Sequence, residues 1–149
     1  MQLTRSLTVA LFCTLGAACL GDSTYQPPTA YRARLLPVAG STVSGTVDAV
    51  SQGRSETEAG LNAQGEPGTT YGWQINEGSC AQPGRILGGR GAYPDFTTNA
   101  ATASNPGRGR VDETFIVGLI MREDPYHAVI LNAARTTILA CGNFERLTF

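Results

Sequence analysis

The chain has 149 residues, of which 42% are hydrophobic and only 15% are charged. This length suits one domain and leaves no room for two ordinary hydrophobic cores. Eleven basic residues, all of them arginine, stand against twelve acidic ones. The resulting net charge of −1 argues against a surface that binds nucleic acid by neutralising its phosphates. The only histidine, His127, cannot by itself form a metal centre that needs several imidazoles.

The N-terminus has the pattern of an export signal. Residues 1–5 give a short basic start, and the apolar segment 7–18 is shorter than the about 20 residues of a membrane span. Small residues stand directly before Cys19, which resembles a bacterial lipoprotein signal, in which this cysteine is acylated and becomes the mature N-terminus. We therefore predict a signal peptide over 1–18 and a lipid on Cys19. Ordinary cleavage after Ala18, with secretion and no lipid, is the alternative.

Residues 19–30 contain glycine, proline and polar residues with little to bury, and we predict an extended tether. The expected location is the bacterial cell envelope, as an exported, outer-membrane-anchored lipoprotein that faces the periplasm or the surface. Cys80 and Cys141 are the cysteines that remain after export. A cysteine pair in an oxidising compartment is expected to form a disulfide.

From residue 31 to residue 149 no stretch has the apolar spacing of an amphipathic helix. Short β-type runs alternate with turn residues, which favours an antiparallel sandwich or barrel. Turn chemistry is expected over residues 63–68, 82–84 and 105–109. The predicted strands are residues 31–36, 42–50, 56–61, 71–77, 110–117, 126–132 and 137–144, with shorter ones around Ile86 and over 97–102.

The run from Tyr71 to Glu77 is the most informative predicted strand. The two-residue period of a strand places Tyr71, Trp73 and Ile75 on one face, where they are natural core residues. The polar side chains of residues 74 and 76 then project outward together from the opposite face.

The segment Gly72-Trp-Gln-Ile-Asn-Glu-Gly-Ser-Cys80 resembles a strand of the copper/zinc superoxide dismutases, which reads Gly-aromatic-His-Val-His-Glu and leads to a cysteine. Leu139-Ala-Cys-Gly142 resembles the last strand of that family, and residues 39–47 and 58–61 resemble its second and third strands. This resemblance implies an eight-stranded antiparallel Greek-key β-sandwich or barrel, superoxide dismutase-like, in the immunoglobulin-like sandwich class. It also implies a Cys80–Cys141 bridge.

The metal-ligand positions of that family are not matched. Its copper-ligand histidines on this strand correspond to Gln74 and Asn76, whose neutral amides are poor ligands for copper or zinc. Residues 81–96, where the family has its bridging and zinc-binding histidines, contain no histidine and one aspartate, Asp95. His127 lies several residues before the place of a further copper histidine. We predict no catalytic residue, no metal site and no cofactor, so neither copper nor zinc is expected to bind.

Four polar residues, Gln74, Asn76, Glu77 and His127, could form a small recognition surface. The simpler interpretation is that the two amides hydrogen-bond to a neighbouring loop and that His127 is a partly exposed strand histidine.

Arginines in or beside turns could converge on an anion, although solvated loop charges are the ordinary interpretation. Asp112 and Glu113 are adjacent on a strand, point to opposite faces and cannot act as a carboxylate pair. The family's active-site arginine is replaced by Ile138, and its role is not assigned to Arg135. The turn arginines are Arg85, Arg90, Arg108 and Arg110.

The sequence thus favours a non-enzymatic binding or structural module at the cell envelope. Its expected partners are the membrane, through the N-terminal lipid, and an envelope protein or glycan, and not nucleic acid. One alternative is residual copper binding through His127, with weak dismutase or copper-delivery activity. Another is a small ligand in the vacated metal pocket.

Overall fold

The computed structural model describes residues 29–38, 40–52, 56–102, 104, 107–117, 121 and 125–148. The predicted signal peptide, Cys19 and the tether up to residue 28 lie outside these described residues. The first strand begins at Ala30, so the domain includes the last residue that we assigned to the tether. No helix in the described part of the chain is long and apolar enough to cross a membrane.

The described residues form nine strands, and all seven main predicted strands are confirmed within a few residues at each end. The short run near Ile86 is also a strand, β5. Of the predicted run 97–102, only Thr97 lies in a strand, β6, which begins one residue earlier at Phe96. The expectation of a turn at residues 82–84 is wrong. These residues belong to β5, where Gln82 and Pro83 pair with β4, and the chain turns at Cys80 and Ala81. The elements are β1 (Ala30–Pro37), β2 (Ser44–Gln52), β3 (Glu56–Gly65), β4 (Thr70–Ser79), β5 (Gln82–Ile86), η1 (Arg90–Ala92), β6 (Phe96–Thr97), β7 (Gly109–Val117), β8 (Tyr126–Asn132) and β9 (Ile138–Arg146).

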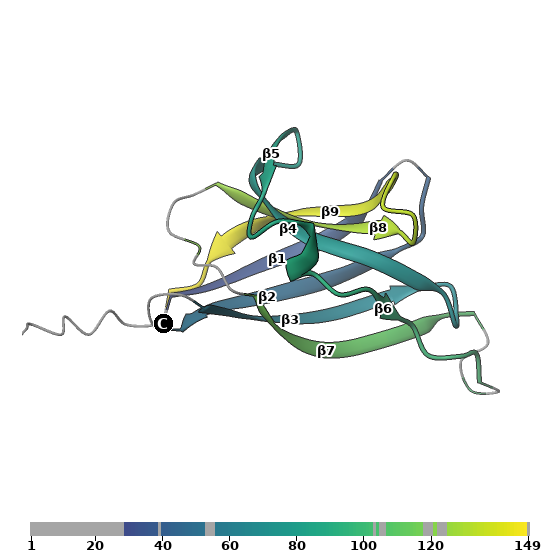
Figure 1. Ribbon diagram of the computed structural model, residues 1–149. Coiled ribbons are helices and arrows are strands. Elements are labelled where there is room, and N and C mark those ends of the chain that lie inside the picture. Colours follow the sequence, from purple (N-terminus) through teal and green to yellow (C-terminus); the bar gives the residue numbers. More distant parts are fainter. Residues whose placement is uncertain are drawn as a thin grey trace, which may run out of the picture.

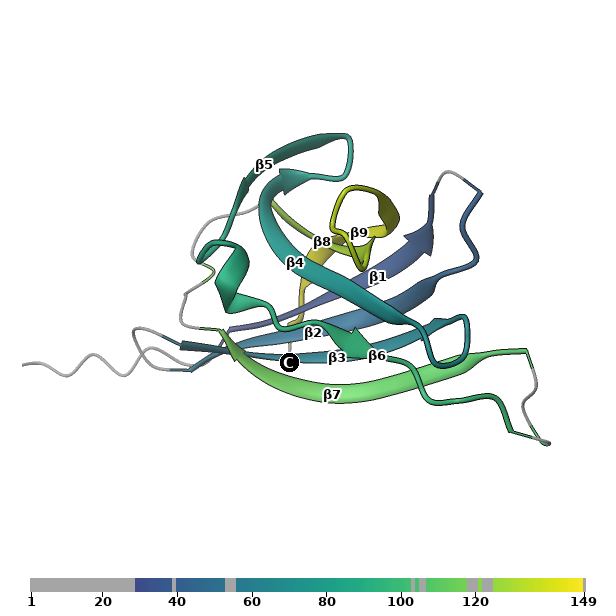
Figure 2. The same ribbon diagram turned by 45° about the vertical axis from the view of Figure 1, so that its right-hand side comes forward.

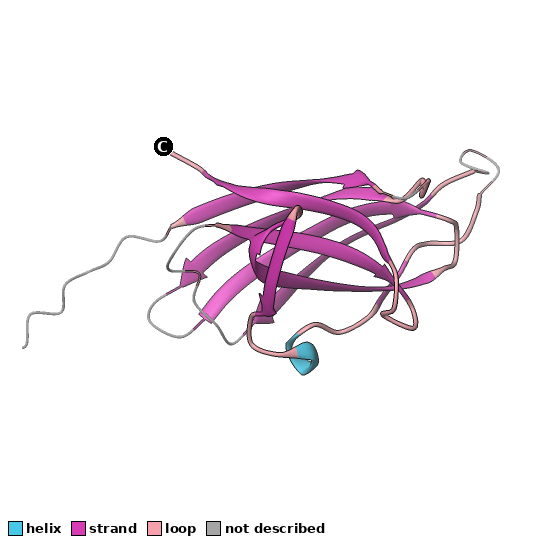
Figure 3. Cartoon of the chain, turned by 90° about the horizontal axis from the view of Figure 1, so that it is seen from above, coloured by secondary structure: helices cyan, strands magenta, loops and turns pink. Residues whose placement is uncertain are grey.

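The strands pair antiparallel in the order β5-β4-β8-β9-β1-β2-β3-β7 (Figure 1). The short strand β6 lies off this path and pairs with the beginning of β4, at Thr70 and Tyr71. The sheet curls into a half-barrel, so that β7 comes round to lie below β4 and β6 (Figure 2). Seen from above, the short helix η1 lies at the side of the strands (Figure 3). The predicted all-β, antiparallel architecture is confirmed.

The core lies inside the curl and follows from the alternation of side chains along each strand. In β3, for example, Thr57, Ala59, Leu61 and Ala63 are all buried, while the residues between them face outward. The small alanines of β3 leave room in the core for the large aromatic side chains of β4, on the opposite side of the curl. The predicted core face of β4, with Tyr71, Trp73 and Ile75 all buried, is confirmed.

The half-barrel closes between the β4 side and β7, and no strand pair joins these two edges among the described residues. The ring of Trp73 lies 5.0 Å from the rings of both Tyr93 and Phe115, measured between centroids. Farther along, the backbone N–H of Asn99 donates to the carbonyl of Arg110 at 2.9 Å, and the Asn99 side chain accepts from the Arg110 N–H at 2.7 Å. Aromatic packing and this reciprocal pair therefore hold the two edges together.

The predicted disulfide between Cys80 and Cys141 is present, with a Cα–Cα distance of 6.0 Å. It joins the turn between β4 and β5 to β9, two segments that are 61 residues apart in sequence. The backbone N–H of Cys80 also donates to the side chain of Asn143 on β9, at 2.9 Å. The β4–β5 hairpin is thereby fixed to the sheet.

The two ends of the barrel differ. At one end, which we call the mouth, the loops after β1, β3 and β8 come together, on the right in Figure 1. At the other end β1 begins and β9 stops, where the N–H of Leu147 donates to the carbonyl of Ala30 at 2.8 Å. The described chain ends therefore lie side by side, away from the mouth.

Candidate functional site

Three polar residues meet on the outer face of β4 and β8, and we call Gln74, Asn76 and His127 the polar row. Asn76 is the cross-strand partner of His127 in the β4–β8 pair. Asn76 is only 4% exposed and His127 is completely buried. Gln74 and Asn76 share the outer face of β4 as predicted, but in the described contacts their amides bond to each other and to His127 instead of to a neighbouring loop. The expectation of a partly exposed His127 is wrong.

The burial of His127 follows from the position of β8 and from the hairpin beside it. β8 lies between β4 and β9, and its outer face is covered as well as its inner face. Gly78 has a φ of +80°, and a Cβ atom at this position would collide with the carbonyl oxygen of Gln82. This glycine lets the chain bring its carbonyl to the His127 ring, while its N–H donates to the Pro125 carbonyl at 2.9 Å.

Hydrogen bonds give the polar row a direction. His127 Nδ1 lies 3.2 Å from the Gly78 carbonyl oxygen, which can only accept, so Nδ1 carries the proton. In the neutral ring, Nε2 then accepts from the side-chain amide of Asn76 at 3.1 Å. The Asn76 Oδ1 in turn accepts from the Gln74 amide at 3.1 Å. Each side chain fixes the orientation of the next, so the row holds a neutral imidazole.

Burial lowers the pKa of His127, because the charged ring would lose its hydration, and the Gly78 carbonyl acts in the opposite direction. A proton on Nε2 would face the amide protons of Asn76. Relief of this clash requires the Asn76 amide to rotate, and its Oδ1 would then no longer accept from Gln74. Protonation of His127 therefore requires both amides of the row to reorient.

We expect the protein to lose stability as the pH falls below the ordinary histidine pKa of about 6.5. The folded-state pKa is lower than the unfolded-state pKa, so the unfolded chain binds the proton first. The contribution of neutral His127 is complete above this pH. Below it, the free energy of unfolding decreases with a slope of at most about 1.4 kcal/mol per pH unit, until the folded protein also takes the proton.

Urea unfolding between pH 8 and pH 5 measures this effect. His127 is the only histidine of the chain, and no other side chain has its ordinary pKa in that range. The His127→Gln variant should therefore lack the slope. An equal slope in this variant would contradict the assignment.

The polar row does not fit a copper or zinc site. Its members offer two amides and one imidazole whose Nε2 lone pair already accepts a hydrogen bond. Soft or imidazole ligands are what these metals prefer. Among the residues that the structure describes, no three His, Cys, Asp or Glu side chains gather as a possible ligand group.

Glu77 does not join the polar row, because it follows Asn76 on the strand and points to the other face. It forms an ion pair with Arg85 of β5, with a shortest nitrogen–oxygen distance of 2.7 Å. The hydrogen bond from Arg85 lowers the pKa of the Glu77 carboxyl. The proposed four-residue recognition surface is therefore not assembled as one patch.

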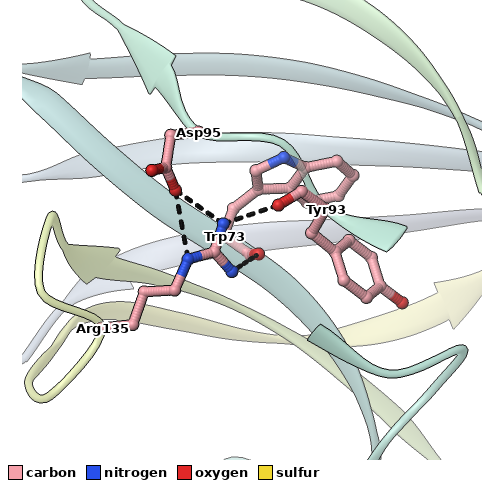
Figure 4. Close-up of polar contacts among 4 residues, drawn as sticks. All are labelled: Trp73, Tyr93, Asp95 and Arg135. Atoms are coloured by element: carbon pink, nitrogen blue, oxygen red, sulfur yellow. Dashed lines mark hydrogen bonds and ion pairs between the residues drawn. The ribbon is translucent and has the colours of Figure 1, made fainter. Parts of the chain in front are cut away.

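A second polar centre, which the sequence did not predict, is built around Arg135 (Figure 4). Its guanidinium donates to the carbonyl of Tyr93 at 2.6 Å and to that of Trp73 at 3.3 Å, and it pairs with Asp95 at 2.6 Å. The side chain lies across Gly72, where a Cβ atom would be 2.9 Å from the arginine Cγ. Only 11% of the Arg135 side chain is exposed. Its contacts join the β8–β9 loop to β4 and to the segment before β6, so we call it the Arg135 brace.

The four turn arginines are all exposed, and no described contact joins them to one another. Arg85 belongs to the ion pair above, and Arg108 donates to the side chain of Gln64 at 3.0 Å. Asp112 and Glu113 pair with consecutive residues of β3 and so point to opposite faces, as predicted.

No protein-family model matches the chain, and no curated protein or solved structure matches it. The polar row, the disulfide and the Arg135 brace are thus the features from which a function is proposed.

Proposed function

We propose that this protein is an exported, lipid-anchored domain of superoxide dismutase-like fold that has no metal site. In this proposal it serves as a binding or structural module at the bacterial cell envelope and does not catalyse dismutation. Its partner is an envelope protein or glycan.

The strand order supports the fold part of the proposal. β1, β2 and β3 are sequential neighbours, and β9 returns to lie beside β1. The chain crosses between the two halves of the sheet after β3, after β6 and after β7. Returns of a late strand to the side of the first strand are typical of Greek-key topology.

The polar row is the observation that carries the functional part. Gln74 and Asn76 stand where the resembling family has copper ligands, and both amides are used in hydrogen bonds within the row. The single imidazole of the chain is bonded through both of its nitrogens. Metal-dependent dismutation needs a redox metal with a ligand set that tolerates two oxidation states, and these residues do not supply one.

The disulfide supports the location. Such bonds persist in oxidising compartments and are rare in the cytosol. The Cys80–Cys141 bond is compatible with the export that the N-terminal pattern predicts.

Metal content and superoxide decay test the absence of a metal site. The full-length chain, purified in detergent with its disulfide intact, is equilibrated with copper and zinc and then desalted. We expect substoichiometric metal and a rate of superoxide decay equal to that of the buffer. Free copper ion in the same buffer is the positive control for the decay assay. The Gln74→His, Asn76→His double variant, which introduces imidazoles at both positions, is the matched comparison. Tight, stoichiometric copper with dismutation by the unaltered protein would overturn the proposal.

Membrane fractionation tests the anchor. The Cys19→Ser variant, expressed in a bacterial host, should move from the membrane fraction to the soluble exported fraction. Labelling with a radioactive fatty acid should be lost in the same variant. Unchanged partitioning would contradict lipid anchoring and would leave the metal-free site unaffected.

A further inference from the structure

The mouth of the half-barrel contains a cavity of about 550 Å³ that is separate from the polar row. Residues of the loops after β1, β3 and β8 line it, so three connections that are distant in sequence meet around one open hollow. This volume lies within the range of pockets that take small organic ligands, and barrel mouths are frequent places for them.

The wall of the cavity combines an apolar inner part with a hydroxyl-bearing rim. Val43 and Tyr71 are buried, and Leu139 is half-buried beside them. Thr42 and Thr137 also line the cavity and are exposed to solvent. An occupant therefore needs an apolar body and a polar end.

Among the described residues that line this cavity, Glu66 is the one that carries a charge. Its backbone is held on both sides: its N–H donates to the Tyr71 hydroxyl at 2.9 Å, and its carbonyl accepts from the Thr98 hydroxyl at 2.6 Å. The ion pairs of the described residues do not include Glu66. Arg108 lines a neighbouring hollow that also reaches Glu66, but it donates to Gln64 instead.

We propose that the mouth binds a small organic cation with a protonated amine on an apolar body. The apolar wall would remove the body from water, and the negative charge of Glu66, an exposed lining residue, would favour the ammonium group. A rim ion pair of this kind contributes up to about 1 kcal/mol, which corresponds to a roughly fivefold change in affinity. The proposal rests on the mouth alone and is independent of the envelope location and of the polar row.

Three size-matched probes test the charge preference. The full-length protein is titrated with phenethylammonium, 2-phenylethanol or 3-phenylpropionate, and binding is followed by amide NMR shifts. We expect the largest shifts at Val43, Thr69 and Leu139. The affinity for the cation should exceed that for the neutral alcohol by up to about fivefold, and the carboxylate should bind more weakly than the alcohol. Equal affinities for the three probes, or shifts centred elsewhere, would overturn the proposal.

Three variants locate the site. Glu66→Gln should weaken phenethylammonium binding roughly fivefold and leave 2-phenylethanol unchanged. Arg108→Gln should leave cation binding equal or stronger, because it removes a nearby positive charge. Ala133→Trp, in the exposed β8–β9 loop of the lining, should block all three probes. Unchanged cation binding in Glu66→Gln, or full binding in Ala133→Trp, would contradict the assignment. Each variant should have the same urea unfolding midpoint as the unaltered protein, which shows that a change in binding is not caused by loss of the fold.

Discussion

Replacement of both half-cystines, Cys80→Ser with Cys141→Ser, is expected to lower the free energy of unfolding by about 4 kcal/mol. The bond links positions that are 61 residues apart and so restricts the unfolded chain. Without it, the unfolded chain has a higher conformational entropy, which favours unfolding. A loss of this size is a large fraction of the about 5–15 kcal/mol that stabilise an ordinary domain. Urea unfolding with linear extrapolation measures the difference.

The Asn143→Ala variant is the matched control, because it removes the hydrogen bond to the Cys80 backbone and keeps the disulfide. We expect a loss of about 1 kcal/mol or less in this variant. Reduction of the unaltered protein should reproduce the result of the double serine variant. A double variant as stable as the oxidised protein would show that the bond does not stabilise the fold.

Trp73→Ala is the second change with a large expected effect, about 3–5 kcal/mol of unfolding free energy. The indole is completely buried and contacts both Tyr93 and Phe115 across the closure of the half-barrel. Its loss would leave a cavity between two edges that no described strand pair joins. The wall opposite carries small side chains, such as Ala59, that cannot fill the space.

Trp73→Phe should be much milder. The indole Nε1 is buried without a hydrogen-bond partner among the described atoms, so phenylalanine loses no hydrogen bond there. Trp73 is the only tryptophan of the chain, so both variants are followed by circular dichroism and not by its fluorescence. A phenylalanine variant as unstable as the alanine variant would indicate that the N–H makes a contribution that the structure does not explain.

The fold could be predicted from the sequence where a strand has a clear two-residue alternation. The buried face of Tyr71, Trp73 and Ile75 is such a case, because side chains of one strand determine it. The burial of Asn76 and His127 could not be predicted in this way. It depends on β8 being an inner strand and on the hairpin that Gly78 allows, and both are tertiary features.

The site was predictable only in part. Gln74 and Asn76 were singled out by their positions in the strand, and the structure brings them together with His127. The Arg135–Asp95 pair was not predicted, because no spacing rule joins two loops 40 residues apart. The glycine at position 72, inside a strand, was the one available signal that another group approaches the backbone closely.

The placement of the chain ends determines how the domain is presented to its surroundings. β1 runs for eight residues from the beginning of the fold toward the mouth, a path of roughly 26 Å along the strand. A lipid or an affinity tag at either terminus would therefore attach the molecule at the end opposite to its mouth. Immobilisation through the N-terminus and through the C-terminus should leave this opening equally accessible to a soluble ligand.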